Sequence, residues 1–223
     1  MKDAPLLRGS LPVRVIALFA GLVVIAVAIV CLLESGFGLP PWDVFHMGIA
    51  EHTPLSLGTA SVVVGLVIVA AAWAAGAPPG FGTVANAVVI GMTINLLTSL
   101  SSVNALSESE LAVRVGLVAA GVLLFGAGSA LYIGAGMGAG PRDSLMLAVS
   151  RRTGWRIGLV RGAIEVTVLI AGLLLGGAAG AGTVVLALLV GPSVELSFWV
   201  VLNAGFAAKA PAHAPEFGPL DIG

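Results

Sequence analysis

The chain has 223 residues, of which 58% are hydrophobic and 9% are charged, and its mean hydropathy is +1.10. Soluble domains carry about 25% charged residues, so this composition excludes a water-soluble globular protein and predicts an integral protein of a lipid bilayer. The formal net charge of −1 excludes a basic surface for nucleic acid. Cys31 is the single cysteine and the three histidines are dispersed, so we expect neither a disulfide nor a metal site.

The first half of the chain predicts a cytoplasmic arm at residues 1–11, three membrane spans and one short helix. About twenty apolar residues cross a hydrocarbon core, and the stretches of that length lie at residues 12–33, 55–75 and 83–100. Gly36 and Gly38 interrupt the chain after the first span, and Pro41 suits the first turn of a new helix. This helix ends near residue 50 and, at about 1.5 Å per residue, is too short to cross.

A polar linker at residues 101–110 leads into a second half with the same order of elements. Its spans are expected at residues 111–133, 156–176 and 183–203. A second broken element covers residues 134–152, and Gly138 and Pro141 precede its short helix. Residues 204–223 are rich in Ala, Pro and Gly and have little to bury, so we expect a disordered tail.

The two halves carry glycines at matching positions, one hundred residues apart. Residues 21–100 hold ten glycines and residues 121–200 hold sixteen, so random placement predicts about two coincidences (10 × 16 / 80), whereas eight occur. Most side chains between these glycines differ, which indicates that a backbone geometry was duplicated. We therefore expect one three-helix repeat at residues 12–100 and another at residues 111–203. An odd number of crossings inverts the second repeat relative to the first.

The predicted fold class is an all-α polytopic membrane protein with six transmembrane helices in two inverted three-helix repeats, each with a broken or re-entrant short helix. The linker at 101–110 contains two glutamates and no lysine or arginine, while the arm carries Lys2 and Arg8. Because basic residues favour the cytoplasmic side, both termini are expected there. The residues expected to shape the turns are Gly36, Gly38, Pro41, Gly82, Thr83, Gly138, Pro141, Gly182 and Thr183.

Polar side chains in or beside the predicted spans are the candidates for binding a substrate or an ion. They are Asp43, His46, Asn86, Asn95, Arg142, Asp143, Arg161, Glu165 and Glu195. Asp43 and Asp143 occupy matching positions in the first turns of the short helices. They either cap these helices or converge as a pair of acids on a central cation or proton site.

The other charged candidates leave similar alternatives open. Arg142 is either a positive residue at the cytoplasmic face or an anion-binding group beside a helix N-terminus. Arg161 and Glu165 are four residues apart on one helix face, as a structural ion pair or as groups that bind or gate a substrate. Asn95 and Glu195 occupy matching positions and are expected to face the interior, where Glu195 either relays protons or packs in a satisfied environment.

Three weaker signals remain. Asn86 suits either the start of its own helix or a ligand, and His46 is either a hydrogen-bonded residue or a ligand. Gly172, Gly176 and Gly180 are spaced by four and predict a close-packing helix face. That face serves either contacts within the chain or a homodimer.

The motifs around the two broken elements resemble those of the YczE/YyaS/YitT family of bacterial membrane proteins. The residues that carry the resemblance are Gly36, Gly38, Pro41, Trp42, Asp43, His46, Gly82, Thr83, Asn86, Gly138, Gly140, Pro141, Arg142, Asp143, Leu145, Met146, Gly182 and Thr183. The resemblance covers residues 12–200 and implies a multi-pass protein of the bacterial inner (plasma) membrane. It implies no particular chemistry.

The sequence contains no Gly-x-Ser-x-Gly elbow, no Walker loop and no His-Glu-x-x-His motif, so we expect neither an enzyme nor a cofactor. Inverted duplication, paired broken helices and charges within spans predict a small secondary transporter or channel-like permease for an unknown solute or ion. The alternative is a non-transporting accessory protein that scaffolds or stabilises a partner. A transporter predicts a polar cavity that reaches the midplane of the membrane, and a scaffold predicts a dry core with one exposed glycine-rich helix face.

Overall fold

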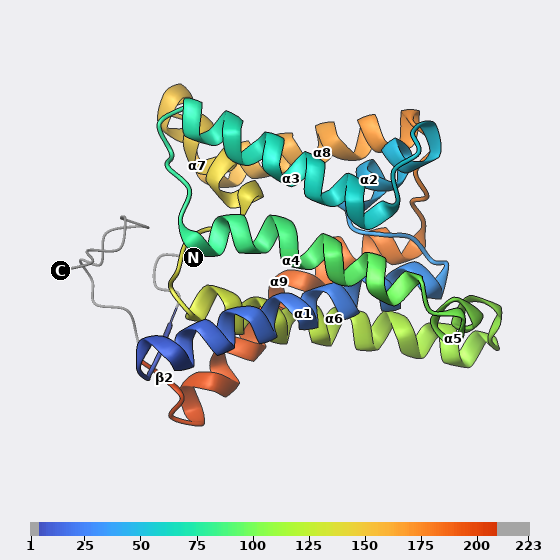
Figure 1. Cartoon of the computed structure of the whole chain (residues 1–223), viewed down its shortest axis with the longest axis horizontal. Helices are drawn as coiled ribbons and strands as arrows, with labels where there is room; N and C mark the ends of the chain where they lie inside the picture. The colour runs from blue at the N-terminus through green and yellow to red at the C-terminus, as the bar shows by residue number, and fades with distance from the viewer. Residues whose placement is uncertain (1–4, 209–223) are drawn as a thin grey trace.

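The structure is a computed structural model that describes residues 5–208, apart from the side chains at positions 157 and 158. Over these residues the chain forms nine α-helices, one 3-10 turn and one pair of two-residue strands (Figure 1). Five of the described helices are long and apolar enough to cross a membrane. They are α1 (Leu11–Ser35), α3 (Leu57–Ala74), α4 (Phe81–Thr98), α6 (Leu111–Gly134) and α9 (Ala181–Asn203). The prediction of an all-α multi-pass membrane protein is therefore confirmed.

Of the remaining helices, α8 (Ile157–Leu174) has the length of a span and the others are shorter. α8, predicted as a span, has 18 residues and carries Arg161 and Glu165; it is not among those five. α2 (Pro41–His52) and α7 (Pro141–Thr153) have 12 and 13 residues, which at about 1.5 Å per residue reach roughly 20 Å. The linker between the halves folds into α5 (Ser101–Asn104) and the 3-10 turn η1 (Ala105–Glu108).

Glycines with left-handed backbone angles lead into both short helices. Gly38 has φ 110° and Gly138 has φ 128°, values that side chains rarely adopt. A Cβ on Gly38 would lie 2.6 Å from the Thr183 hydroxyl oxygen. Proline then starts each helix at a position where a missing N–H costs nothing. These features explain why α2 and α7 begin where the sequence predicts.

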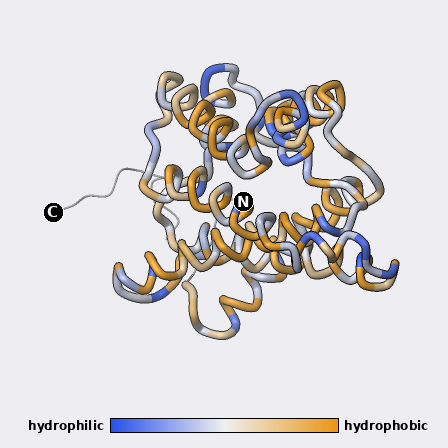
Figure 2. The backbone as a smooth tube through the Cα atoms, turned by 45° about the vertical axis from the view of Figure 1, so that its right-hand side comes forward, coloured by the Kyte–Doolittle hydropathy of each residue, from blue (hydrophilic) through white to orange (hydrophobic). Residues whose placement is uncertain are grey.

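The core forms where α1 crosses α6. Gly21 and Gly128 face each other there, and a Cβ on either would lie 2.7 Å from the other's carbonyl oxygen. Leu18, Leu22 and Ile25 of α1 are buried beside this crossing. Figure 2 shows hydrophobic residues along most of the helices, with hydrophilic segments mainly at turns and helix ends. Much of the apolar surface faces outward, with Leu174 82% exposed, as expected for helices in lipid.

Each short helix packs against a helix of the other half. α2 lies on α8, and α7 lies on α3 (Figure 1). α1 contacts α4, and α6 contacts α9 in the same way. The halves differ in one respect, because α3 packs along α4, whereas the described residues of α8 and α9 show no comparable contact.

The two ends of the described chain meet. β1 (Leu6–Leu7) pairs with β2 (Ala207–Ala208) in antiparallel fashion, and the Arg8 N–H donates to the Phe206 carbonyl at 2.8 Å. Residues 204–208 were predicted as the start of a disordered tail. They are ordered instead because their backbone groups pair with the arm, and the rest of the predicted tail lies outside the described residues.

Glycines of the spaced motif in α8 and the following turn pack within the chain. A Cβ on Gly172 would lie 2.7 Å from the Phe45 amide nitrogen of α2, and a Cβ on Gly180 would lie 2.5 Å from the Phe37 carbonyl oxygen. Of the two interpretations of this face, contacts within the chain account for these two glycines. Gly176, at φ 79°, has open space around it.

Candidate functional site

The two short helices meet at their first turns, where a carboxylate of one half contacts a guanidinium of the other. Asp43 of α2 is only 1% exposed, and its Oδ1 lies 3.6 Å from Nη2 of Arg142 on α7. The same Oδ1 lies 3.3 Å from Nδ1 of His46, one turn further along α2. The Arg142 guanidinium also covers the Trp42 ring, 5.2 Å from its centre. The cluster thus brings together three of the predicted site residues, Asp43 and His46 from the first half and Arg142 from the second.

The second oxygen of Asp43 is buried without a partner. Oδ2 has no hydrogen-bond donor among the described residues. A carboxylate that only capped its helix would accept a backbone N–H there, and no such bond is present for Asp43. Leaving a buried acceptor unpaired costs about 1–3 kcal/mol, and more for a charged group. The position is therefore poorly explained by helix capping alone and suits a proton or a ligand that supplies the missing interaction.

Asp143 of α7 lies in a second polar group beside the first. The Tyr132 hydroxyl of α6 donates to Oδ2 of Asp143 at 3.2 Å. A Cβ on Gly140 would lie 3.5 Å from Asp143 Oδ2 and 3.7 Å from Asn86 Nδ2, so Asn86 of α4 borders the same spot. Asp143 is half-buried, whereas Asp43 is fully buried. The two matched acids thus have different environments.

Arg161 and Glu165 form the predicted ion pair, with Nε and Oε1 3.0 Å apart. The pair is not buried as expected, because the two side chains are 55% and 40% exposed. Gly172, where α8 packs against Phe45 of α2, lies on the same helix face as the pair but two to three turns further along. The pair therefore lies beyond this contact, toward the start of α8.

Asn95 and Glu195 lie away from the Asp43 cluster. Asn95 accepts from the Ser56 hydroxyl at 2.6 Å and donates to the Thr59 hydroxyl at 2.9 Å, so it fastens α4 to the start of α3. Glu195 is exposed on α9, and the expectation that it faces the interior is wrong. Ser193 faces α6 instead, where it donates to the Val122 carbonyl at 2.8 Å. Two residues further along a helix, Glu195 points about 200° away.

The turn before α4 and the matching turn before α9 each bind the glycine-containing segment that precedes the short helix of the other half. The Gly82 N–H donates to the Met137 carbonyl at 2.8 Å, and the Gly182 N–H donates to the Phe37 carbonyl at 2.7 Å. The Thr83 hydroxyl donates to the Ala139 carbonyl at 2.6 Å. These contacts across the halves position the first turns of α2 and α7, and with them Asp43, Arg142 and Asp143.

Three functional positions escaped the sequence interpretation. Tyr132 is the single tyrosine of the chain. Its polar hydroxyl inside a predicted span could have indicated a hydrogen bond to another polar residue. Arg14 donates to the Ala135 carbonyl at 2.7 Å, and Arg114 donates to the Ser35 carbonyl at 2.8 Å. These two arginines are also one hundred residues apart. That offset could have indicated that each, from the start of its own helix, binds the carbonyl at the end of the other helix, α6 or α1.

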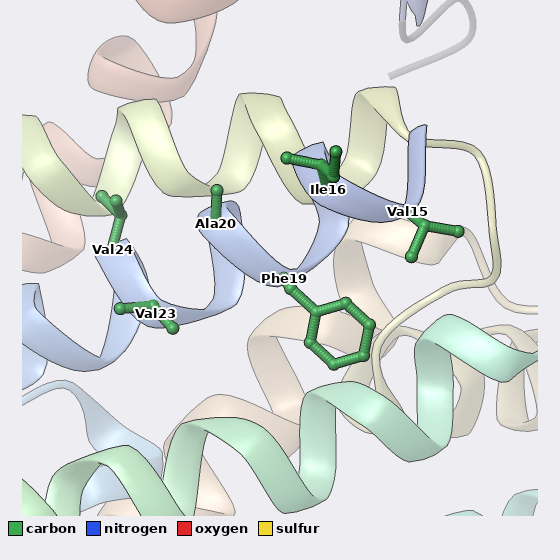
Figure 3. A pocket seen from close by; sticks show the side chains of 6 residues that line it. All are labelled: Val15, Ile16, Phe19, Ala20, Val23 and Val24. Atoms are coloured by element: carbon green, nitrogen blue, oxygen red, sulfur yellow. The ribbon is translucent and has the colours of Figure 1, made fainter. Parts of the chain in front are cut away.

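An open hollow on the outer face of α1 is apolar and does not belong to the site (Figure 3). Its lining consists of Val15, Ile16, Phe19, Ala20, Val23 and Val24. No cluster of three His, Cys, Asp or Glu residues that could hold a metal occurs in the described part of the chain.

Comparisons with known proteins agree with a membrane protein but assign no activity. Residues 12–198 match a model described as a family of unknown function (DUF6198). The chain is 34% identical over 224 residues to an uncharacterized membrane protein, YczE, of Bacillus subtilis, covering 93% of this chain and all of the relative. It is also 34% identical over 161 residues to an uncharacterized protein of Haemophilus influenzae, covering 72% of each. No solved structure matches.

Proposed function

Because the chain belongs to the family of unknown function DUF6198, we propose its function from its own structure: a small permease for a small solute or ion. Whether it acts as a secondary transporter or as a channel, the path runs through the junction of α2 and α7. No catalytic role and no cofactor enter the proposal. The protein would lie in the bacterial inner membrane with both termini in the cytoplasm.

The observation that carries this proposal is the contact of Asp43 with Arg142. The two residues come from different halves and meet at the first turns of two helices too short to cross. Charged groups inside a membrane protein are costly to keep, and they mark ion or substrate pathways. The unpartnered Oδ2 of Asp43 offers one acceptor to a proton, a cation or a donor group of a solute.

Six spans in two inverted repeats are supported by where the chain ends meet. The pairing of β1 with β2 puts both ends on one side, which requires an even number of crossings. Five apolar helices alone give an odd number, so α8 supplies the sixth crossing. The matched bonds of Gly82 to Met137 and of Gly182 to Phe37 fit two copies of one unit related by a twofold axis.

The alternative of an accessory scaffold receives less support. It predicted a dry core and an exposed glycine-rich helix face, but Gly172 and Gly180 pack inside the chain. The buried Asp43 is also costly for a protein that only needs to pack.

A binding screen tests the proposal. Purified protein is heated with panels of inorganic ions, organic cations, anions and zwitterions, and the unfolding midpoint is recorded for each. A ligand at about one hundred times its dissociation constant stabilises by about 2.7 kcal/mol. We expect a solute that raises the midpoint of the wild type and of Glu51→Gln, an exposed acid on the same helix, but not of Asp43→Asn. A solute that stabilises Asp43→Asn equally would place the site elsewhere, and a screen without any shift would favour the scaffold.

A further inference from the structure

The two halves, although matched in sequence, are packed differently, and the clearest difference lies between their last two long helices. In the first half, Gly58 of α3 and Gly91 of α4 are in backbone contact, so that a Cβ on either would collide with the other's carbonyl oxygen. The bonds of Asn95 to Ser56 and to Thr59, at 2.6 and 2.9 Å, close the same end of this interface. α3 and α4 therefore form a tight interface at the start of α3.

The matching end of the second half is open. Gly191 of α9, which corresponds to Gly91, has no atom of the described residues within 4 Å of a Cβ built on it. Glu195 corresponds to Asn95 and Arg156 corresponds to Ser56, and both are exposed. Figure 1 shows the start of α8 and the end of α9 well separated at one side of the molecule, whereas α3 and α4 approach each other at the other side.

If the two halves are inverted copies of one unit, their different packing shows two conformations of that unit side by side in one molecule. A transporter built this way passes to its opposite state when each half takes up the arrangement of the other. Resting on the proposed function, we propose that the protein has a second conformation in which α9 closes on α8 and Glu195 pairs with Arg156. In that conformation α4 leaves α3, and Asn95 releases Ser56.

Two local features, Gly191 and Pro192 of α9, fit this movement. Pro192 lies inside α9 directly after Gly191, where a proline removes a helix hydrogen bond and permits a bend; α4 has Met92 at the matching position. Ser193, directly after Pro192, is bonded to the Val122 carbonyl of α6, so α9 can pivot about this contact and carry Glu195, two residues further along, toward α8.

A third feature limits the extent of the new interface. Gly65 lets α3 approach Ala87 closely, since a Cβ on Gly65 would lie 3.0 Å from the Ala87 Cβ. Glu165 stands at the matching position of α8 and is bound to Arg161. The closed contact in the second half is thus confined to the end that carries Arg156 and Gly191.

The difference between the matched acids agrees with the present conformation. Asp43 is fully buried, whereas Asp143 is half-buried and lies near the exposed Arg161 and Glu165. In the proposed movement, the opening between α8 and α9 gives access to Asp143 in this state. The second conformation reverses the direction of access.

Two cysteine pairs in a Cys31→Ala background test the movement in native membranes. One pair replaces Ser56 and Asn95, which are bonded here, and the other replaces Arg156 and Glu195, which are separated here. A short thiol-specific cross-linker should join both pairs in separate samples. Locking the second pair should increase labelling by a water-soluble maleimide of a single added cysteine at Thr59, whereas locking the first should not.

A second measurement serves if a cysteine pair folds poorly. A single cysteine at Leu159, which is 64% exposed here, should label several-fold faster when Glu195→Ala removes the pairing partner, and at the original rate in Glu195→Gln, which retains a hydrogen-bonding group as in Asn95. The proposed movement would be contradicted if only the cysteine pair at positions 56 and 95 were cross-linked and if the labelling rate at position 159 did not change with the residue at position 195. If solute binding still depended on Asp43 in that case, the proposed movement would be wrong but the proposed permease function would stand.

Discussion

The Arg142 guanidinium carbon lies 5.2 Å from the centre of the Trp42 ring, although the two residues occupy the same position in the two halves of the chain. Residues at equivalent positions touch each other only close to the axis that relates two copies. The contact of Gly21 with Gly128 also lies between equivalent helices, where α1 crosses α6. The arginine therefore brings charge to the centre of the molecule, beside the buried Asp43.

Removing Arg142 should destabilise the protein by leaving Asp43 unpaired. Breaking a buried ion pair costs about 3–5 kcal/mol, and we expect less for Arg142→Ala because this side chain is 35% exposed. Adding Asp43→Asn to Arg142→Ala should recover part of the loss, since the uncompensated charge disappears. Thermal unfolding in detergent gives the comparison, with Glu51→Gln as the control. Losses that simply add would show that the two side chains act independently.

Alanine at Gly82 or Gly182 should be poorly tolerated. A Cβ at either position would lie 2.9 Å from a carbonyl oxygen, of Met137 or of Phe37, and overpacking of this kind costs about 1–3 kcal/mol. Gly116→Ala is the matched control, because Gly116 lies on α6 with open space around it. The folded yield of a fluorescent fusion after gel filtration measures the effect. Equal yields for all three variants would contradict the close approach of the turns.

The ion pair of Arg161 and Glu165 should contribute little to stability. Exposed pairs in water contribute about 0.2–1 kcal/mol, and the open side between α8 and α9 gives these side chains access to water if the further inference holds. A double-mutant cycle of Arg161→Ala and Glu165→Ala measures the coupling free energy. A coupling above about 3 kcal/mol would mean that the pair is buried in protein or lipid.

Removing the Tyr132 hydroxyl should loosen Asp143 without disturbing the core. Tyr132→Phe deletes one hydrogen bond to a carboxylate, which contributes about 1.5–3 kcal/mol. The aromatic ring remains in its buried position, so the folded yield should stay unchanged while the unfolding midpoint falls. Tyr132→Phe in an Asp143→Asn background should then have a smaller effect. An equal effect in both backgrounds would show that the hydroxyl has another partner.

The backbone plan could be predicted from the sequence because glycine and proline restrict geometry locally. The start of α2 at Pro41 and of α7 at Pro141 needed no knowledge of packing. The matched glycines likewise indicated Gly82 and Gly182 as close contacts.

The contacts between side chains could not be predicted, because they depend on how the helices pack, and the spacing of residues in the sequence does not determine that packing. Asp43 and Arg142 are about one hundred residues apart, and their contact follows from how the two halves of the chain pack against each other. The orientation of Glu195 was predicted from its match to Asn95, and it failed because the halves adopt different arrangements around equivalent residues.

The most direct test of the central claim, two inverted halves that share one site, is the sidedness of Thr53 and Thr153. Thr53 directly follows α2 and Thr153 is the last residue of α7. Both are exposed, and each hydroxyl donates to the carbonyl four residues earlier. Single cysteines at these positions, in a Cys31→Ala background, are labelled with an impermeant maleimide in intact cells and in inside-out vesicles. The account predicts that residue 53 labels only in cells and residue 153 only in inside-out vesicles. Labelling of both residues from the same side would contradict it.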